Sequence, residues 1–217
     1  MKLILFDCDG TLVDSAGLIH EVMLRTFAHF DLSLPQLGDT KAIIGLTLDI
    51  AIARMQGKAH ADDQAVAMMA YYKSIFADVR AEALHEEPLF SGIADVIDKL
   101  STCKNRLIGA VTGKSRRGLN LVLEGHGFAP HFVVSRTADD CPSKPHPAMV
   151  SECCDETGID ARNTIVIGDA IYDMQMAKSA GAIAIGVAWG YASVDALMEA
   201  GADAIAHHPT DLLSHIL

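Results

Sequence analysis

Residues 3–11 read Leu3-Ile4-Leu5-Phe6-Asp7-Cys8-Asp9-Gly10-Thr11, a short apolar run that meets two carboxylates and a glycine. A continuous apolar run bounded by polar residues is typical of a buried strand. Successive residues of an extended chain point to opposite sides, so Asp7 and Asp9 can share one side. Gly10 allows a sharp turn and lets an anion approach main-chain N–H groups. The stretch therefore predicts a buried strand that ends in an acidic turn.

Apolar runs of the same kind recur through the rest of the chain. They cover residues 107–111, 132–134, 164–167, 182–187 and 204–206. Helical periodicity fills the intervals between them, at residues 115–126, 147–157, 172–180 and 193–200. Strands that alternate with helices are the signature of a parallel sheet with helices on both faces. We therefore predict an α/β fold with a Rossmann-like core, whose functional groups gather beyond the carboxyl ends of the strands.

One long segment interrupts this alternation. Between residues 15 and 85 the sequence is rich in Ala, Met, Leu and Ile at helical spacing and has no convincing strand. Prolines and glycines divide it into three or four helices. We predict a small all-helical domain over residues 15–85, inserted after the first strand into a core domain of residues 1–14 and 86–217. The alternative is that these helices simply pack on the sheet.

The composition limits the classes of partner. The chain has 217 residues, of which 50% are hydrophobic and 21% charged, and its net charge is −11 at pH 7. This negative charge argues against nucleic acid and anionic membranes as partners. No apolar run has the length of a membrane helix, and the apolar start meets Asp7 too early for a signal peptide. An anionic substrate would therefore need local positive charge at its site.

The cysteines indicate a compartment. The chain contains five, an odd number, and none stands at metal-ligand spacing. Cys153 and Cys154 are neighbours in a predicted helix, where buried or idle thiols are the simplest interpretation. Unpaired cysteines are typical of a reducing environment, so we expect a cytoplasmic protein. We expect it to be a monomer or a homodimer.

A second acidic group follows the apolar run at residues 164–167. Asp169 lies at the predicted end of that strand, and Asp173 lies four residues further, on the same face once a helix begins. Acidic residues in a first helical turn are also ordinary helix caps. Paired carboxylates such as Asp7 and Asp9 repel each other unless a cation or a proton lies between them. Oxygen ligands suit a hard cation, so the two acidic groups predict a Mg²⁺ site.

Two further segments offer groups that bind phosphate. Thr112-Gly113-Lys114-Ser115 ends a predicted strand, and a P-loop would require glycine where the chain has Ile108. What remains is a hydroxyl and a free N–H before a helix N-terminus, a place that binds phosphate. Lys144 lies in Ser143-Lys144-Pro145-His146-Pro147, where the prolines restrict the backbone. The lysine is then held as a fixed point charge for phosphate and carboxylates.

In order along the chain, these four segments resemble the signature motifs of the haloacid dehalogenase superfamily. Residues 7–11 are similar to the first motif, Thr112 to the second and Lys144 to the third. Gly168-Asp169 with Asp173 is similar to the fourth. The helical insertion resembles the cap domain of that superfamily's first cap class. Within the superfamily, the chain looks most like the phosphoglycolate phosphatase group.

The resemblance implies a Mg²⁺-dependent phosphatase that hydrolyses a small phosphorylated metabolite through an aspartyl-phosphate intermediate. It implies Asp7 as the nucleophile and Asp9 as the acid and base. It assigns the metal to Asp7, Asp169 and the backbone carbonyl of Asp9. The remaining roles that it implies are phosphate binding by Thr112, the Gly113 N–H and Lys144, and orientation of metal-bound waters or of Lys144 by Asp173.

The same fold supports other activities. Superfamily members that act as 2-haloacid dehalogenases lack the second aspartate, so Asp9 argues against that reaction. Phosphosugar mutases resemble a pattern with His twelve residues after the nucleophile, where this chain has Ile19, and His20 is one residue off. An inorganic pyrophosphatase and a non-catalytic binding module are further alternatives.

Substrate selection is predicted to lie in the cap, at Gly45 and Leu46. The residues around them are mostly small or apolar, and no arginine stands there for a substrate carboxylate. Arg116 and Arg117 follow the Thr112 segment and could meet such a carboxylate, although a solvated helix face is the simpler interpretation.

Overall fold

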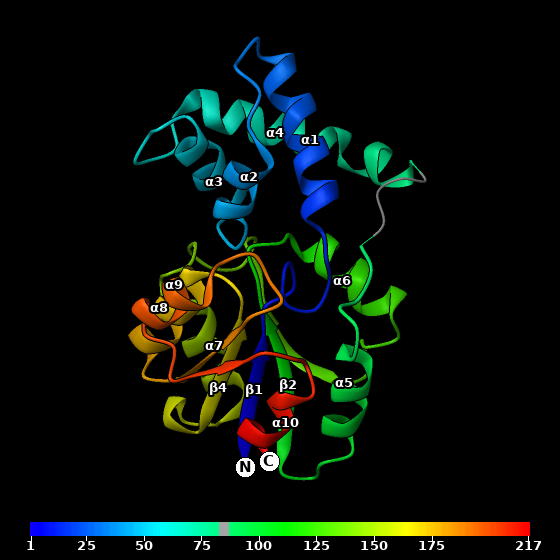
Figure 1. Ribbon diagram of the computed structural model, residues 1–217, viewed down its shortest axis with the longest axis vertical. Coiled ribbons are helices and arrows are strands. Elements are labelled where there is room, and N and C mark those ends of the chain that lie inside the picture. Colours follow the sequence, from blue (N-terminus) through cyan, green and yellow to red (C-terminus); the bar gives the residue numbers. More distant parts are fainter. Residues whose placement is uncertain (83–86) are drawn as a thin grey trace.

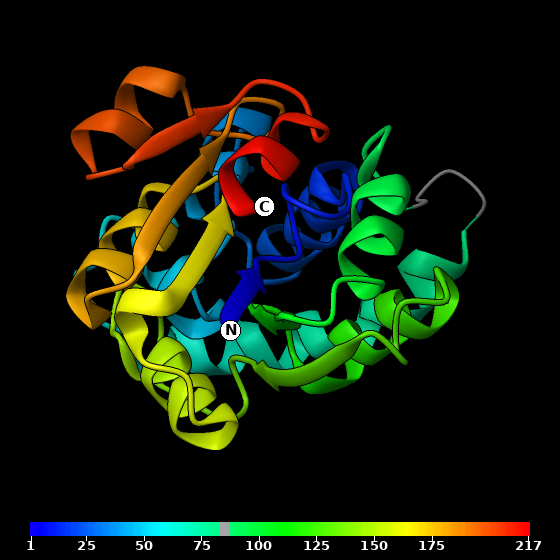
Figure 2. The same cartoon turned by 90° about the horizontal axis from the view of Figure 1, so that it is seen from below.

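A six-stranded parallel sheet forms the base of the molecule in the computed structural model, which describes residues 1–82 and 87–217 (Figure 1, Figure 2). Its strand order is β3-β2-β1-β4-β5-β6. The strands are β1 (Lys2–Phe6), β2 (Arg106–Val111), β3 (Phe132–Arg136), β4 (Thr164–Gly168), β5 (Ile183–Val187) and β6 (Ala204–Ala206). The predicted α/β fold with a parallel sheet is confirmed, and each predicted strand is present to within a few residues.

The central strand β1 is buried on both faces. Leu3 and Leu5 pack in one hydrophobic cluster, whereas Ile4 and Phe6 pack in another, as the alternation of an extended chain requires. The first cluster is covered by α7 (Ala148–Thr157), α8 (Ile171–Ala180) and α9 (Val194–Glu199). The second is covered by α5 (Ile93–Ser101), α6 (Arg116–Gly125) and α10 (Asp211–Ile216). Helices therefore lie on both faces, as predicted.

Helix α5 is missing from the sequence-based prediction. Its buried residues Ile93, Val96, Ile97 and Leu100 recur at helical spacing, so the periodic signal was present in the sequence. The sequence-based prediction passed from the helical insert directly to the strand at residues 107–111 and assigned no helix between them.

In the described part of the chain between β1 and α5, four helices form a second layer beyond the carboxyl ends of the strands (Figure 1). We call them the helical layer; they are α1 (Ala16–His29), α2 (Leu37–Ile43), α3 (Leu48–Met55) and α4 (Asp63–Ala81). They enclose a hydrophobic cluster of their own, which includes Met23, Ile52 and Met68. The division into core and cap domains stays a prediction, and its boundary between residues 85 and 86 lies outside the described residues.

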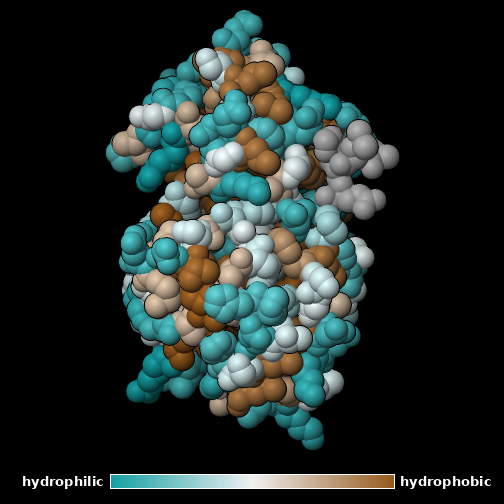
Figure 3. All heavy atoms as spheres, viewed as in Figure 1, coloured by the Kyte–Doolittle hydropathy of each residue, from teal (hydrophilic) through white to brown (hydrophobic). Residues whose placement is uncertain are grey.

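Polar contacts join the helical layer to the sheet edge. Thr47 N donates to Ser143 Oγ at 2.9 Å, and Tyr172 Oη donates to the carbonyl of Ala42 at 3.3 Å. On the face shown in Figure 3, hydrophobic groups are scattered among hydrophilic ones over both layers. None of the helices described here combines the length and hydropathy that a membrane crossing would require. The hydrogen bonds of Thr47 and Tyr172 show that the two layers meet at the carboxyl ends of the strands, where the predicted site residues lie.

Candidate active site

Three carboxylates meet where β1 and β4 end. Asp7 follows β1, and its N–H donates to the carbonyl of Ile167 at 2.8 Å, which holds the two strand ends together. Asp169 follows β4, and Asp173 lies in the first turn of α8. One oxygen from each of Asp7, Asp169 and Asp173 lies within 4.8 Å of the others, and all three residues are buried. The predicted convergence of the acidic groups at the strand tips is present for Asp7, Asp169 and Asp173, but not for the carboxylate of Asp9.

Asp7 has an incomplete set of partners. It is 1% exposed, and within the described part of the chain neither carboxylate oxygen accepts a hydrogen bond. Lys144 Nζ lies 2.9 Å from Oδ1, as an ion pair. Burial raises the pKa of Asp7 to about 7, although the nearby Lys144 ammonium opposes this rise. A buried carboxylate without hydrogen bonds is costly unless a further positive group is present.

Asp169 is held from two sides. Its Oδ1 accepts a hydrogen bond from Thr11 Oγ1 at 3.0 Å, and its Oδ2 accepts one from Tyr191 N at 2.9 Å. Burial raises the pKa of Asp169 well above its usual range, and the negative charges of Asp7 and Asp173 add to this rise. Gly10 has φ 86°, and a Cβ there would lie 2.3 Å from Asp169 Oδ2, so only glycine fits the turn.

Asp173 serves two groups at once. Its Oδ2 accepts from Ala170 N at 3.0 Å at the start of α8, and its Oδ1 accepts from Lys144 Nζ at 2.6 Å. Both alternatives considered for this residue, a helix cap and a member of the acidic cluster, are therefore present in the structure. With both oxygens engaged, Asp173 is placed to hold Lys144 rather than to supply a free ligand atom.

The acidic cluster fits a divalent cation. Among residues 1–82 and 87–217, it carries three carboxylates and the ammonium group of Lys144, and the oxygens of Asp7 lack hydrogen bonds. Carboxylate oxygens are the ligands of hard cations such as Mg²⁺. The carboxylate of Asp9 lies outside this cluster, because its Oδ1 accepts from Lys114 Nζ at 2.8 Å. The resemblance implied a ligand role for the backbone carbonyl of Asp9, and that role stays a prediction.

Lys144 is the buried cation of the site. It is 1% exposed and lies between Asp7 and Asp173. Burial opposes its charge, but the two carboxylates outweigh burial and raise the pKa of Lys144 above its usual value. The ammonium group therefore stays charged in the interior, which is the local positive charge that a net charge of −11 requires.

Thr112 and Gly113 follow β2, the neighbour of β1. Thr112 is fully buried, and its Oγ1 accepts from Lys114 N at 3.1 Å, which leaves the hydroxyl proton free to donate. A Cβ at Gly113 would lie 2.6 Å from the carbonyl oxygens of Gly45 and Leu46. The predicted cap residues therefore lie directly over the predicted phosphate loop and present backbone to it, because the Leu46 side chain is buried in the helical layer.

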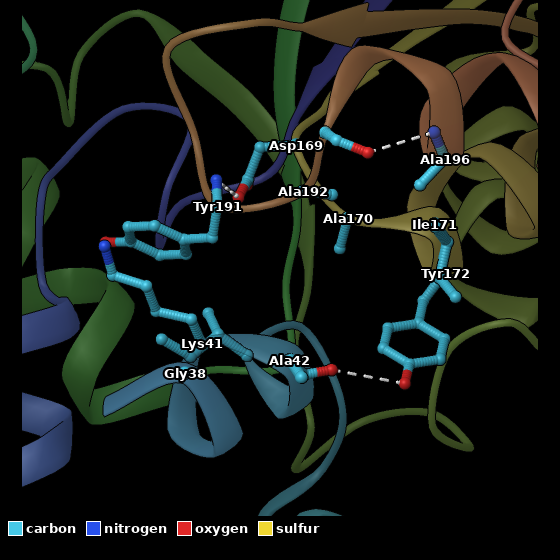
Figure 4. Close-up of a pocket in the computed structure, with 12 residues that line it drawn as sticks. Gly38, Lys41, Ala42, Asp169, Ala170, Ile171, Tyr172, Tyr191, Ala192 and Ala196 are labelled. Carbon is cyan, nitrogen blue, oxygen red and sulfur yellow. Dashed lines mark hydrogen bonds between the residues drawn. The ribbon is translucent and has the colours of Figure 1, made fainter. Parts of the chain in front are cut away.

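A cavity of about 330 Å³ opens beside the acidic cluster (Figure 4). It lies between α2 and the loops that follow β4 and β5, and its lining includes Asp169, Lys41 and Tyr172. Lys41 extends below the ring of Tyr191, with Nζ 5.4 Å from the ring centroid. Arg116 does not line this cavity, since it contacts Ser135 and Asp140 instead. The solvated-face interpretation of that arginine fits this placement.

Sequence reasoning missed several residues that shape the site. Thr11 and Tyr191 both hold Asp169. From the sequence, Tyr191 could line the mouth of the site or merely pack; it lines the cavity, but its bond to Asp169 was not predicted. Lys114 was considered only as part of a rejected P-loop, and Glu87, which binds its ammonium, was not considered. A lysine directly after a phosphate-binding loop was an available signal. The hydrogen bond of Tyr191 comes from its main chain, so the residue type gives no sign of it.

Comparisons with a family model, with related proteins and with a solved structure agree with one another. Residues 4–187 match the family model described as haloacid dehalogenase-like hydrolase. The chain is 33% identical to "Probable phosphatase IndB" of Dickeya dadantii, over 91% of this chain and 86% of that protein. It is 31% identical to the phosphoglycolate phosphatase of Escherichia coli strain K12, over 96% of this chain and 89% of that enzyme. The solved structure of a "predicted phosphatase" from Clostridium acetobutylicum, 25% identical, superposes with a TM-score of 0.87 over 99% of this chain and 97% of that one.

Proposed function

This chain belongs to the haloacid dehalogenase-like hydrolase family and is a phosphatase, and we propose that it hydrolyses a small phosphorylated metabolite through an aspartyl phosphate on Asp7, with Mg²⁺ as cofactor. The observation that carries the proposal is the environment of Asp7. Its carboxylate is buried without hydrogen bonds, beside Lys144 and in one cluster with Asp169. The oxygens of Asp7 are therefore not occupied by hydrogen bonds, and they lie at the end of a central strand, where substrates of α/β proteins bind.

The proposed reaction has two displacements. An oxygen of Asp7 attacks phosphorus, and the bond from phosphorus to the ester oxygen breaks with its electron pair on that oxygen. Asp9 donates a proton to the departing alcohol. In the second displacement a water oxygen attacks phosphorus while Asp9 accepts a proton from that water. The bond from phosphorus to the Asp7 oxygen breaks with its electron pair on that oxygen, so phosphate is released and the Asp7 carboxylate is restored. Covalent catalysis of this kind divides one difficult step into two easier ones.

The phosphate oxygens need positive groups around them. Lys144 is ion-paired with Asp7, and Thr112 and Gly113 follow the neighbouring strand β2. We propose that Lys144, the hydroxyl of Thr112 and the N–H of Gly113 bind these oxygens as charge develops. Mg²⁺, held by Asp7, Asp169 and the backbone carbonyl of Asp9, would supply Lewis-acid stabilisation of that charge. The ionised form of Asp7 is the nucleophile, and the Lys144 ammonium favours that form because it opposes the rise in pKa that burial causes.

Removal of the metal tests the cofactor. In excess EDTA, hydrolysis of p-nitrophenyl phosphate should fall at least about a hundredfold, and added Mg²⁺ should restore it. Because the ion binds the folded state, Mg²⁺ should also raise the melting temperature of the EDTA-treated protein. Asp169→Asn should weaken both responses. Full activity in EDTA would contradict the proposed cofactor.

The substrate is proposed to place its leaving group in the cavity beside Asp169. Ala42 lines this cavity from α2, so Ala42→Phe should narrow it. We expect the KM of the best ester in a panel to rise about tenfold and the ranking of esters to change, with inhibition by orthovanadate within about threefold of wild type. Ala42→Ser is the control. An unchanged ranking would argue against the cavity as the leaving-group site.

Gly45 is a poorer position for this experiment. Its φ is 103°, and a Cβ there would lie 3.4 Å from the Cβ of Ala170. Any side chain at this residue would strain the backbone, so a loss of stability would be mixed with a change in specificity. Ala42 avoids this problem because it lies within helix α2.

A panel of phosphate monoesters, pyrophosphate and a sugar monophosphate tests the function as a whole. Release of inorganic phosphate from monoesters supports it, whereas isomerisation of the sugar phosphate without phosphate release would indicate a mutase. His20, the residue closest to the mutase pattern, has its Nδ1 2.8 Å from Thr40 Oγ1 within the helical layer. We further propose a cytoplasmic location, in keeping with free thiols at all five cysteines.

A further inference from the structure

Lys114 lies at the centre of a chain of ion pairs. Its Nζ donates to Asp9 Oδ1 and to Glu87 Oε1, each at 2.8 Å. Glu87 Oε2 in turn lies 2.8 Å from Nε of Arg80, in the last turn of α4. The side chains of Lys114, Asp9 and Glu87 are 8%, 9% and 3% exposed. Each of these buried charges is stabilised by its oppositely charged partner, because the removal of one partner leaves the other charge buried and unpaired.

The fold makes room for the Lys114 side chain. A Cβ at Gly118, in α6, would lie 2.9 Å from Lys114 Cγ and 3.2 Å from its Cε. Glycine inside a helix costs about 1 kcal/mol relative to alanine, and the space for the lysine stem accounts for its presence here. On another side, the ring of Phe76 in α4 has its centroid 5.9 Å from Nζ. The ammonium group is therefore confined by α6, by α4 and by its two carboxylate partners.

The hold on Asp9 affects one oxygen only. Lys114 engages Oδ1, and nothing in the two described ranges of the chain donates to Oδ2. Because the two oxygens of a carboxylate are rigidly linked, a fixed Oδ1 limits the direction in which Oδ2 points. The carboxylate of Asp9 lies outside the acidic cluster of Asp7, Asp169 and Asp173 and contacts Lys114 instead.

We propose that Lys114 is a positioning residue that aims the free oxygen of Asp9 at the leaving-group oxygen, with Glu87 and the space at Gly118 holding the lysine in place. The inference rests on the proposed function, since it requires proton donation by Asp9. If Lys114 has this role, its loss should lower the rate most for esters whose leaving group must be protonated as it departs. An alkoxide needs one, whereas nitrophenolate departs as a stable anion.

Two esters separate this role from a general structural role. Lys114→Met keeps the apolar stem and removes the ammonium group. For the best aliphatic monoester of the panel, kcat/KM should fall about 10- to 100-fold, while for p-nitrophenyl phosphate it should fall less than about threefold. The ratio kcat/KM reports steps up to departure of the alcohol, so the later role of Asp9 as a base does not enter it. Lys178→Met, which breaks an exposed pair with Asp203, is the control and should leave both ratios unchanged.

A second variant protects the test against misfolding. Gly118→Ala keeps every charge but should displace the lysine stem, and alanine favours the helix. We expect the same selective loss for the aliphatic ester, at least about fivefold, in a protein whose melting curve still shows a folded state. Gly125→Ala, in the same helix with nothing within 4 Å of its added Cβ, should have no effect.

The outcomes distinguish this inference from the proposed function. A selective loss in Lys114→Met or Gly118→Ala supports positioning of Asp9 by Lys114. Equal losses for the two esters, or no loss in either variant, would overturn the inference and leave the phosphatase mechanism standing. A wild-type protein that hydrolyses neither ester would overturn both.

Discussion

Asp7→Asn is expected to lower kcat by about 10⁴-fold or more, because the amide cannot act as the nucleophile. The protein should remain folded, since asparagine has nearly the same shape and Lys144 keeps its ion pair with Asp173. The variant also removes one charge from a cluster of three buried carboxylates. We therefore expect its melting temperature in EDTA to equal or exceed that of the wild type. Steady-state kinetics with p-nitrophenyl phosphate and a melting curve on the same sample provide the measurement.

Asp14→Asn is the matched control for this experiment. Asp14 lies just beyond the same acidic turn, but it is exposed, and its Oδ1 accepts a hydrogen bond from Tyr191 Oη at 3.0 Å. Its replacement should change kcat by less than about threefold. Retention of more than a tenth of the wild-type activity in Asp7→Asn would exclude the covalent mechanism.

The sheet and its strand tips could be predicted because they depend on local patterns. Short apolar runs alternate with helical periodicity, and parallel strands bring their carboxyl ends to one edge. Asp7 and Asp169 therefore meet although they lie far apart in sequence, and no contact had to be known in advance. The prediction of a metal-binding cluster followed from the residue types at those tips.

The contacts that orient these groups were not predictable in the same way. The Asp9–Lys114 pair joins residues 105 positions apart, and its existence depends on a gap beside Gly118 and on Glu87 behind it. Tyr191 binds Asp169 through a main-chain N–H, which any residue except proline would supply. Asp173 shows a different limit, since its helix-cap and ion-pair roles predict the same residue type. Only the directions of its two oxygens show that both roles occur.

Lys144→Met should cause the largest loss of stability among the proposed variants. Lys144 is the cation paired with Asp7 and Asp173, and its side chain has no exposed surface. Breaking a buried pair by the removal of one partner typically costs about 3–5 kcal/mol. We expect the free energy of unfolding in EDTA to fall by about this amount. Activity should fall at least about 10³-fold even where the protein is folded, because a phosphate-binding cation is lost.

Two comparisons assign this loss to the uncompensated carboxylates. Lys58→Met breaks an ion pair with Asp62 that is exposed on the helical layer, and it should cost no more than about 1 kcal/mol. Adding Asp173→Asn to Lys144→Met removes one unpaired charge, so the double variant should be more stable than Lys144→Met alone. Mg²⁺ should lessen the defect of Lys144→Met, since the ion would supply positive charge to the same cluster. Urea unfolding with and without Mg²⁺ measures all of these differences. If Lys144→Met unfolds at the same urea concentration as Lys58→Met, Lys144 does not neutralise the cluster, and the electrostatic account of the site is wrong.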